Sequence, residues 1–315
     1  MPVTVKDRVA IVTGAGGGLG FAYAMALAKA GAKVVVNDYG GDTTGANAGE
    51  DISRAQRAAE KIVAAGGVAV ANTGDVTKDY EAIVATAIEA FGCVDILVNN
   101  AGVLGRMGKP DTVDAANFRR VVDITALGSA MMTRTVYPHM KARNWGRIVN
   151  VSSGSIFGLD FGSDCAYTAS KGAAFGMTRE LGRVAVRDGI KCNGVLPSGT
   201  SRLTALTPEL HELTKQFMRP EQAAHFVVLL CSEECPVSGE LFNITGVNAS
   251  RVALATYPGT NQESAEGFLA NWYAVMGNKE DAVFLNSTGE LAGFLFSRAS
   301  GSKFDTLENF GVHLD

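Results

Sequence analysis

Cysteine and charge are both scarce in this chain of 315 residues, and each shortage excludes a class of protein. The five cysteines are an odd, scattered set without closely spaced pairs of pairs, which argues against a disulfide framework and a structural zinc site. Cys231 and Cys235 are four residues apart, a spacing that favours two buried thiols on one helix face over a redox pair. We expect no metal cofactor.

Charged residues make up 19% of the chain, and its formal net charge is −4. This balance offers no basic surface to nucleic acid or an anionic membrane, so a small molecule is the expected partner. No stretch reaches ~18 uninterrupted apolar residues, and residues 1–8 have no apolar run of signal-peptide length. The last residues, Val312 to Asp315, are not a peroxisomal address. These features predict a cytoplasmic protein without a membrane span.

Short β-branched runs alternate with alanine-rich stretches along most of the chain. This rhythm is typical of repeated βαβ units, in which helices cover both faces of a parallel sheet. The predicted fold is α/β, with a doubly wound, seven-stranded parallel sheet in a domain of residues 1–247. Strands are expected at Arg8–Gly14, Lys33–Asp38, Val68–Val76, Asp95–Ala101, Gly146–Ser153, Lys191–Pro197 and Glu240–Thr245.

After Gly246 the rhythm stops, and residues 248–315 are predicted to form a helical C-terminal extension. Its expected helices are Ser264–Met276 and Gly289–Arg298. The first carries the aromatic residues Phe268, Trp272 and Tyr273 at positions suited to docking on a surface. The extension is therefore a candidate cover for the active site of its own or a neighbouring subunit, or an oligomer contact.

A glycine-rich run from Thr13 to Gly20 follows the first predicted strand and opens a helix. Glycines let the backbone approach a pyrophosphate closely, and the helix N-terminus offers that anion unpaired amides. Asp38 ends the second strand roughly 20 residues later, where a carboxylate accepts hydrogen bonds from the adenosine ribose. A 2′-phosphate would be repelled there, and no Lys or Arg lies in the loop or directly after Asp38. The pattern therefore predicts NAD in preference to NADP.

Tyr167 and Lys171 are four residues apart, so on a helix their side chains meet on one face. A free phenol titrates near ~10, too high for a base at neutral pH. A nearby fixed positive charge favours the phenolate, so Lys171 is expected to lower the pKa of Tyr167 into a useful range. A surface tyrosine beside a solvated lysine would give the same pattern.

Three further motifs follow the expected strands in order: Asp75-Val76, Asn99-Asn100-Ala101-Gly102 and Ser152-Ser153. With them, about residues 5–247 resemble the short-chain dehydrogenase/reductase family, which implies a Rossmann-type fold. Within that family the chain is most similar to the dehydrogenase part of the type 2 peroxisomal multifunctional enzymes, also called 17β-hydroxysteroid dehydrogenase type 4, and to their bacterial single-domain relatives. The supporting segments are Asn37–Asp42, Ile190–Asn193, Ser201–Thr204 and Glu240–Phe242.

The resemblance implies a role for each matching residue. Tyr167 is the acid/base on the substrate oxygen, Lys171 holds the nicotinamide ribose, and Ser153 binds and polarises the substrate oxygen. The other expected cofactor contacts are Gly14, Gly18, Leu19, Gly20, Asp38, Asp75, Val76 and Asn99.

Two departures from the family pattern affect this transfer. The family places its serine thirteen residues before the tyrosine, where this chain has Gly154, so Ser153 and Ser155 compete for the role. The ungapped strand before Ser153 favours that residue. At Thr125, three residues before Gly128, many members carry an asparagine that anchors a water relay from the lysine.

The subgroup implies oxidation of a (3R)-hydroxyacyl-CoA to the 3-ketoacyl-CoA with NAD, and its bacterial members point to a bulky or sterol side-chain acyl group. Oxidation of a free steroid 17β-hydroxyl, ketone reduction, and a non-enzymatic nucleotide-binding scaffold stay open as alternatives. Five apolar residues have two possible roles: they line an apolar substrate site, or they pack on the core as loop residues. They are Leu104, Met107, Phe157, Leu159 and Phe161. Family members commonly form dimers or tetramers through their long helices, so a homodimer or homotetramer is expected.

Overall fold

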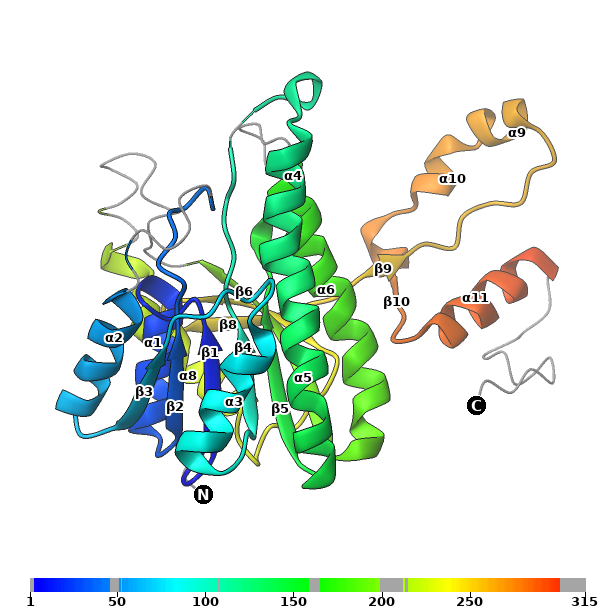
Figure 1. The fold of residues 1–315 in the computed structure, drawn as a ribbon. Coiled ribbons are helices and arrows are strands. Elements are labelled where there is room, and N and C mark those ends of the chain that lie inside the picture. The colour runs from blue at the N-terminus through cyan, green and yellow to red at the C-terminus, as the bar shows by residue number, and fades with distance from the viewer. Residues whose placement is uncertain are drawn as a thin grey trace. The chain divides into compact units, whose positions relative to one another are not determined.

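The computed structural model describes residues 3–45, 51, 53–106, 108–158, 165–198, 212 and 215–300. A sheet in the order β3-β2-β1-β4-β5-β6-β7-β8 organises the main unit (Figure 1). Its first seven strands are parallel, as predicted, and each overlaps its predicted range. They are β1 Val9–Thr13, β2 Lys33–Asn37, β3 Val68–Asn72, β4 Ile96–Asn99, β5 Gly146–Val151, β6 Ile190–Ser198 and β7 Leu241–Thr245.

An eighth strand, β8 Asn248–Val252, pairs antiparallel with β7 and corrects the prediction of seven strands. Gly246 permits the reversal, because its φ of 50° lies in the left-handed region that glycine adopts readily. Thr245 and Asn248 are opposite each other across this turn. The compact main unit therefore extends to Val252, whereas the sequence predicts its end at residue 247.

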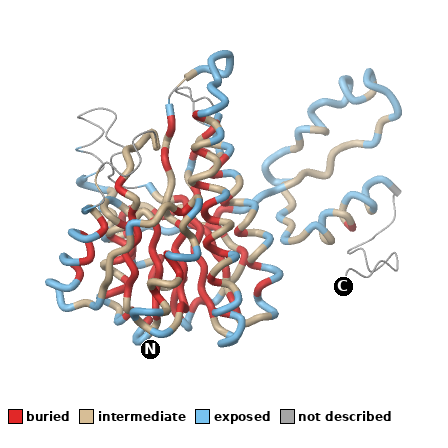
Figure 2. Tube along the Cα trace, in the orientation of Figure 1, coloured by how far each residue is buried: buried red, intermediate tan, exposed pale blue. Residues whose placement is uncertain are grey.

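Helices cover both faces of the sheet, and each face has its own core. The cores meet at the sheet because successive strand residues point to opposite sides: Val12 packs in one core and Ile11 in the other. The central strands are buried along most of their length (Figure 2). One core includes α1 Gly18–Lys29, α2 Ser53–Ala64 and α8 Pro220–Leu230, and the other α3 Tyr80–Phe91, α5 Gly128–Ala142 and the end of α6 Ala166–Val184. Within the described ranges, no helix is both long and apolar enough to cross a membrane.

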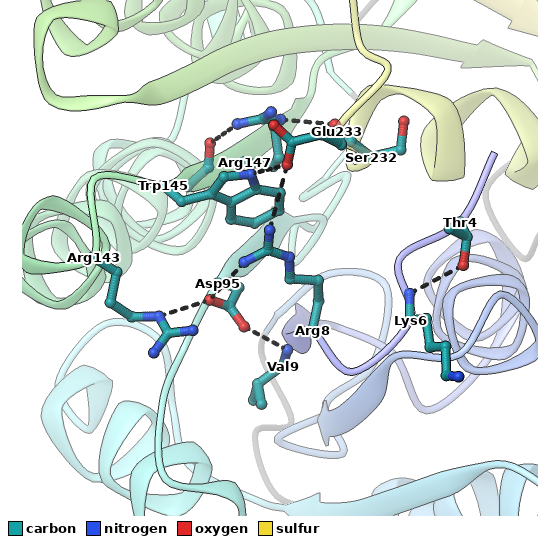
Figure 3. A network of polar contacts seen from close by, with 11 residues as sticks. Thr4, Lys6, Arg8, Val9, Asp95, Arg143, Trp145, Arg147, Ser232 and Glu233 are labelled. Atoms are coloured by element: carbon teal, nitrogen blue, oxygen red, sulfur yellow. Dashed lines mark hydrogen bonds and ion pairs between the residues drawn. The ribbon is translucent and has the colours of Figure 1, made fainter. Parts of the chain in front are cut away.

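A polar network fastens the amino ends of the central strands (Figure 3). Asp95, only 1% exposed, accepts hydrogen bonds from Val9 N at 2.9 Å and Arg143 Nε at 3.1 Å. The guanidinium of Arg8 lies 3.7 Å from Asp95 and 3.6 Å from the centre of the Trp145 ring. Glu233, just after α8, accepts from both Arg8 and Trp145. The network therefore joins the starts of β1, β4 and β5 to the end of α8.

The C-terminal unit, Ala253–Asp315, has little core of its own in its described part. It pairs β9 Ala255–Thr256 with β10 Val283–Phe284 and carries α9 Ala265–Ala270, α10 Trp272–Met276 and α11 Thr288–Ser300. The predicted continuous helix Ser264–Met276 is wrong, because Asn271 leaves helical geometry at φ −108° and ψ 25°. Neither α9 nor α10 contains a buried residue (Figure 2).

Candidate active site

A cavity of about 1240 Å³ opens at the carboxyl ends of β1 to β4. Between β1 and β4 the strand order changes direction, and ligands of doubly wound sheets bind at such a switch point. The walls come from the glycine loop after β1, the segments after β2, β3 and β4, and one side of helix α4 Ala115–Val122. A dinucleotide is a ligand of suitable size and shape for this position.

The glycine loop is packed too closely to hold side chains. Gly14 and Gly18 have φ values of 63° and 55°, which favour glycine. A Cβ at Gly20 would lie 2.3 Å from the carbonyl oxygen of Gly14 and 2.4 Å from Nδ2 of Asn100. Residues 16–20, Leu19 included, line the cavity where α1 begins, and no carboxylate occupies the first turn of that helix. This arrangement fits a pyrophosphate at the helix N-terminus.

Asp38 follows β2 and lines the same cavity, although it is only 6% exposed. Its Oδ2 accepts a hydrogen bond from Gly16 N at 2.8 Å, and its Oδ1 accepts one from Gly40 N at 2.8 Å. These two backbone donors fix the carboxylate beside the glycine loop, at the end of the cavity where the sequence places the adenosine ribose.

Asp75 and Val76 also line the cavity, after β3. Asp75 is turned back on its own loop, since Oδ1 accepts from Thr77 N at 2.9 Å and Thr77 Oγ1 at 2.8 Å. Val76 packs tightly against Gly128, where a Cβ would lie 2.8 Å from Val76 Cγ2. The apolar wall formed by Val76 suits the flat face of an adenine.

Asn99 is the last residue of β4, and the following Asn100 lines the cavity. Asn99 is 3% exposed, and its Nδ2 donates to Thr133 Oγ1 at 3.1 Å and Asn150 Oδ1 at 3.0 Å in the sheet interior. Asn100 Nδ2 donates to the carbonyl oxygens of Thr13 and Gly14 at 2.8 and 3.0 Å. The Asn99 side chain thus lies in the sheet interior, and the Asn100 side chain supports the glycine loop, because consecutive residues point to opposite sides. The expected cofactor contact of Asn99 stays a prediction.

Tyr167 and Lys171 lie one turn apart on α6, and Lys171 Nζ is 5.7 Å from the centre of the tyrosine ring. Lys171 is 4% exposed, and Nζ donates to the carbonyl oxygen of Val151 at 2.8 Å. Burial lowers the pKa of this lysine to about 8. The pair is therefore an internal one, in contrast to a surface tyrosine beside a solvated lysine.

Ser153 brings a hydroxyl to the tyrosine. It precedes the 3₁₀ turn Gly154–Phe157, and its Oγ accepts from Ser155 N at 3.1 Å. Burial raises the pKa of Tyr167, while a hydrogen bond with the Ser153 side chain acts to lower it. The expected net lowering by Lys171 is thus corrected, because burial is the largest influence on the phenol.

Ser155, the competing serine, is 3% exposed. Among the described residues, its Oγ has no hydrogen-bond partner. The two serines therefore differ in environment: the Ser153 hydroxyl meets the phenol of Tyr167, whereas the Ser155 hydroxyl is enclosed in the turn.

Thr125 lies in a π-helical turn, Asp123–Leu127, between α4 and α5. Such turns are frequent at functional sites. Thr125 is 2% exposed, and within the described part of the chain its Oγ1 has no hydrogen-bond partner. A Cβ at Gly102 would lie 3.2 Å from both Thr125 Oγ1 and Lys171 Nζ. Gly102 thus keeps open a space shared by the threonine hydroxyl and the lysine ammonium.

The apolar walls proposed for the substrate are only partly visible. Phe157 is 72% exposed, and Leu104 N donates to the carbonyl oxygen of Thr43 at 2.9 Å. Met107, Leu159, Phe161 and the segment Ser201–Thr204 lie outside the described residues.

Comparison with known proteins shows which family has this fold and these motifs. The sequence model of the short chain dehydrogenases matches residues 8–214. The chain is 36% identical over 299 residues to peroxisomal multifunctional enzyme A of Dictyostelium discoideum, covering 94% of this chain and 66% of the relative. It is 37% identical over 243 residues to the peroxisomal hydratase-dehydrogenase-epimerase of Saccharomyces cerevisiae, covering 77% of this chain and 26% of that relative. The chain thus spans between a quarter and two thirds of these longer proteins.

The fold is also similar to that of a solved 7α-hydroxysteroid dehydrogenase, complexed with NADH and 7-oxo glycochenodeoxycholic acid. The TM-score is 0.67 at 29% identity, covering 78% of this chain and 96% of that one. Fold, motifs and family match agree, and the chain belongs to the short-chain dehydrogenase family of enzymes.

Proposed function

We propose that this enzyme oxidises a (3R)-hydroxyacyl-CoA to the 3-ketoacyl-CoA with NAD. The observation that carries the chemistry is the hydrogen bond between Ser153 and Tyr167, with Lys171 one helical turn away. This grouping combines a hydroxyl from the turn after β5 with a phenol and a buried amine from helix α6. It suits transfer of a proton to and from an alcohol oxygen.

The cavity fits NAD by its glycine loop, by Asp38 and by the wall at Val76. Gly18, Leu19 and Gly20 would hold the pyrophosphate, and Asp38 the adenosine ribose. When bound, NAD supplies a nicotinamide ring that accepts the hydride from the carbinol carbon. The solved hydroxysteroid dehydrogenase with NADH supports this choice of cofactor.

The side chains of this enzyme handle the proton and the oxygen charge. Tyr167 Oη, as phenolate, takes the substrate hydroxyl proton, and Lys171 as an ammonium stabilises that phenolate. Ser153 Oγ hydrogen-bonds to the substrate oxygen as its negative charge develops. The buried position of Lys171 strengthens its attraction to the phenolate, since the surroundings have a low dielectric constant.

The acyl-CoA substrate is inferred from the relatives, one of which is named a hydratase-dehydrogenase-epimerase. The direct test is a panel of (3R)-hydroxyacyl-CoA thioesters of different bulk, each assayed with NAD beside the matching free hydroxy acid. We expect kcat/KM to be at least about tenfold higher for the thioesters, the ratio given by 1.4 kcal/mol of binding to the CoA group. Equal values for thioester and free acid would contradict the assignment.

Oxidation of a free steroid alcohol is the second candidate. It is favoured by the similarity to a hydroxysteroid dehydrogenase solved with a keto bile acid. The same panel separates the two when a 17β-hydroxysteroid and a bile acid are added to it. A steroid that exceeds every thioester in kcat/KM would establish this second function.

Replacing the two serines separately should assign the oxygen-polarising role. Ser153→Ala removes the hydroxyl beside Tyr167, and we expect kcat to fall by about 100-fold, as for loss of one donor to a developing oxyanion. Ser155→Ala is the matched control, with kcat within about threefold. Steady-state kinetics with a saturating thioester measures both, and the reverse order of effects would transfer the role to Ser155.

We further propose that the C-terminal extension completes the enzyme by contact with a second copy in a homodimer or homotetramer. Large apolar side chains stay exposed on it, including Leu269 at 75%, Trp272 at 54% and Tyr273 at 92%. Several large apolar side chains exposed within a short segment often mark an interaction surface.

A chain that ends at Val252 tests the role of the extension, since this end keeps β8 paired in the sheet. We expect a smaller oligomer by light scattering and a raised KM for the thioester. Far-UV circular dichroism and NAD affinity check that the shortened enzyme is folded. An unchanged mass together with unchanged kinetics would remove the proposal.

A further inference from the structure

The carboxylate of Asp38 is held by donors from three directions. Besides the N–H groups of Gly16 and Gly40, Nη2 of Arg54 lies 3.5 Å from Asp38 Oδ2. The carboxylate and guanidinium are both largely buried, with side-chain exposures of 7% and 16%. Two backbone amides and one guanidinium form a cradle for an oxyanion, and Asp38 fills it.

The cradle is built closely around its anion. A Cβ at Gly16 would lie 2.7 Å from Asp38 Oδ2 and 2.9 Å from Arg54 Cβ, so only glycine leaves room for both groups. Arg54 is also held independently of Asp38, because its Nη1 donates to the carbonyl oxygen of Gly41 at 2.8 Å. This hydrogen bond should keep the guanidinium in place when the Asp38 carboxylate is removed.

This cradle faces the ligand cavity, since Gly16, Asp38, Gly41 and Arg54 all line it. A phosphate monoester carries the same kind of acceptor oxygens as a carboxylate and more negative charge. Arginine binds phosphate through paired donors, and it accommodates the 2′-phosphate in enzymes that use NADP.

We propose that Asp38 occupies a latent phosphate site, in which Arg54 and the amides of Gly16 and Gly40 bind the 2′-phosphate of NADP when the carboxylate is absent. Arg54 is then a specificity-determining residue: it positions Asp38 in the native enzyme and becomes the phosphate anchor without it. The proposal rests on the dinucleotide cofactor of the proposed function and is independent of the substrate.

Arg57, one turn further along α2, provides a matched control. It lines the same cavity, but its guanidinium pairs with Asp51 at 2.5 Å and its side chain is 53% exposed. Arg57 therefore carries the same positive charge on the same helix, three residues after Arg54, but does not contact Asp38 in the cradle.

The test compares the binding of adenosine 2′,5′-bisphosphate and 5′-AMP by isothermal titration calorimetry, which needs no turnover. The native enzyme should bind 5′-AMP more tightly, by about tenfold or more. Asp38→Ala should reverse the preference to at least about tenfold in favour of the bisphosphate, the ratio that 1.4 kcal/mol of charge-assisted hydrogen bonding gives. Asp38→Ser, which keeps an acceptor for the amides, should shift it in the same direction.

Adding Arg54→Ala to Asp38→Ala should abolish the gained preference, whereas adding Arg57→Ala should retain most of it. Binding of 5′-AMP to each variant verifies that the site is folded. A double variant without Arg54 that still prefers the bisphosphate would overturn the role of Arg54. An Asp38→Ala or Asp38→Ser enzyme that binds 5′-AMP but gains nothing for the bisphosphate would overturn the latent site. Failure of the thioester assay would leave both results unaffected.

Discussion

Tyr167→Phe should lower kcat for the preferred alcohol by about 1000-fold, within the range typical for the loss of a general acid or base. The substitution keeps the ring on α6 and removes only the oxygen that hydrogen-bonds with Ser153. Because the phenol exchanges a proton in the chemical step, the affinity for NAD should stay nearly constant. Stopped-flow measurement of NADH formation and titration with NADH separate the two effects.

Tyr137→Phe is a suitable control for that experiment. Tyr137 lies on α5, and its hydroxyl donates to Asp188 at 2.7 Å, remote from the cavity. We expect its kcat to match that of the native enzyme. If Tyr167→Phe kept kcat within about threefold, the assignment of Tyr167 as acid/base would be wrong.

Lys171→Met should abolish turnover and, at neutral pH, stabilise the protein. A lysine pKa lowered from 10.5 to about 8 corresponds to about 3 kcal/mol of burial cost to the charged amine. Part of this gain is lost because the Val151 carbonyl oxygen loses its donor. We expect a net increase of roughly 1 to 2 kcal/mol in the free energy of unfolding, measured with urea in the absence of added nucleotide.

The pH dependence gives a second readout for Lys171. Between about 8 and 10.5 the unfolded chain binds the lysine proton more tightly than the folded protein does. The contribution of this group therefore makes stability rise with pH through that window, and the rise should disappear in Lys171→Met. Lys29→Met, at an exposed position of α1, should leave both stability and its pH dependence nearly unchanged. A less stable Lys171→Met protein would contradict the burial argument.

Periodicity predicts the parallel sheet well because the central strands β1, β4 and β5 are buried on both faces and are read as apolar runs. The same reasoning misses β8, whose first four residues are exposed and carry no such run. It also merges α9 and α10, since their residues favour a helix while the chain bends at Asn271. Short elements without a core leave little apolar pattern in a sequence.

In the candidate site, too, the sequence reveals some residues and misses others. Residues that carry chemistry at fixed spacing, Tyr167 and Lys171, could be found from the sequence, and so could the glycine loop. The sequence could not show that the Asn99 side chain lies in the sheet interior and the Asn100 side chain beside the glycine loop, because the pattern does not distinguish adjacent asparagines. Arg54 gave no local signal, since it reaches Asp38 from another element sixteen residues away.

Several sequence-based expectations are still predictions. Among them are the cytoplasmic location, the homodimer or homotetramer, the thioester substrate and the role of the extension. The part played by Thr125, whose hydroxyl has no hydrogen-bond partner among the described residues and lies near Lys171, belongs with them. Each depends on surroundings beyond a single chain or on a bound ligand.

The network around Asp95 in Figure 3 affects how the specificity of this enzyme can evolve. It fastens the strands at their amino ends, whereas the cavity lies at their carboxyl ends, about 17 Å away along a strand of five residues. Substitutions in the loops that select a substrate therefore leave this fastening intact. Ligand specificity can therefore change at the carboxyl ends of the strands while the Asp95 network keeps the amino ends in place, so specificity and stability can evolve independently.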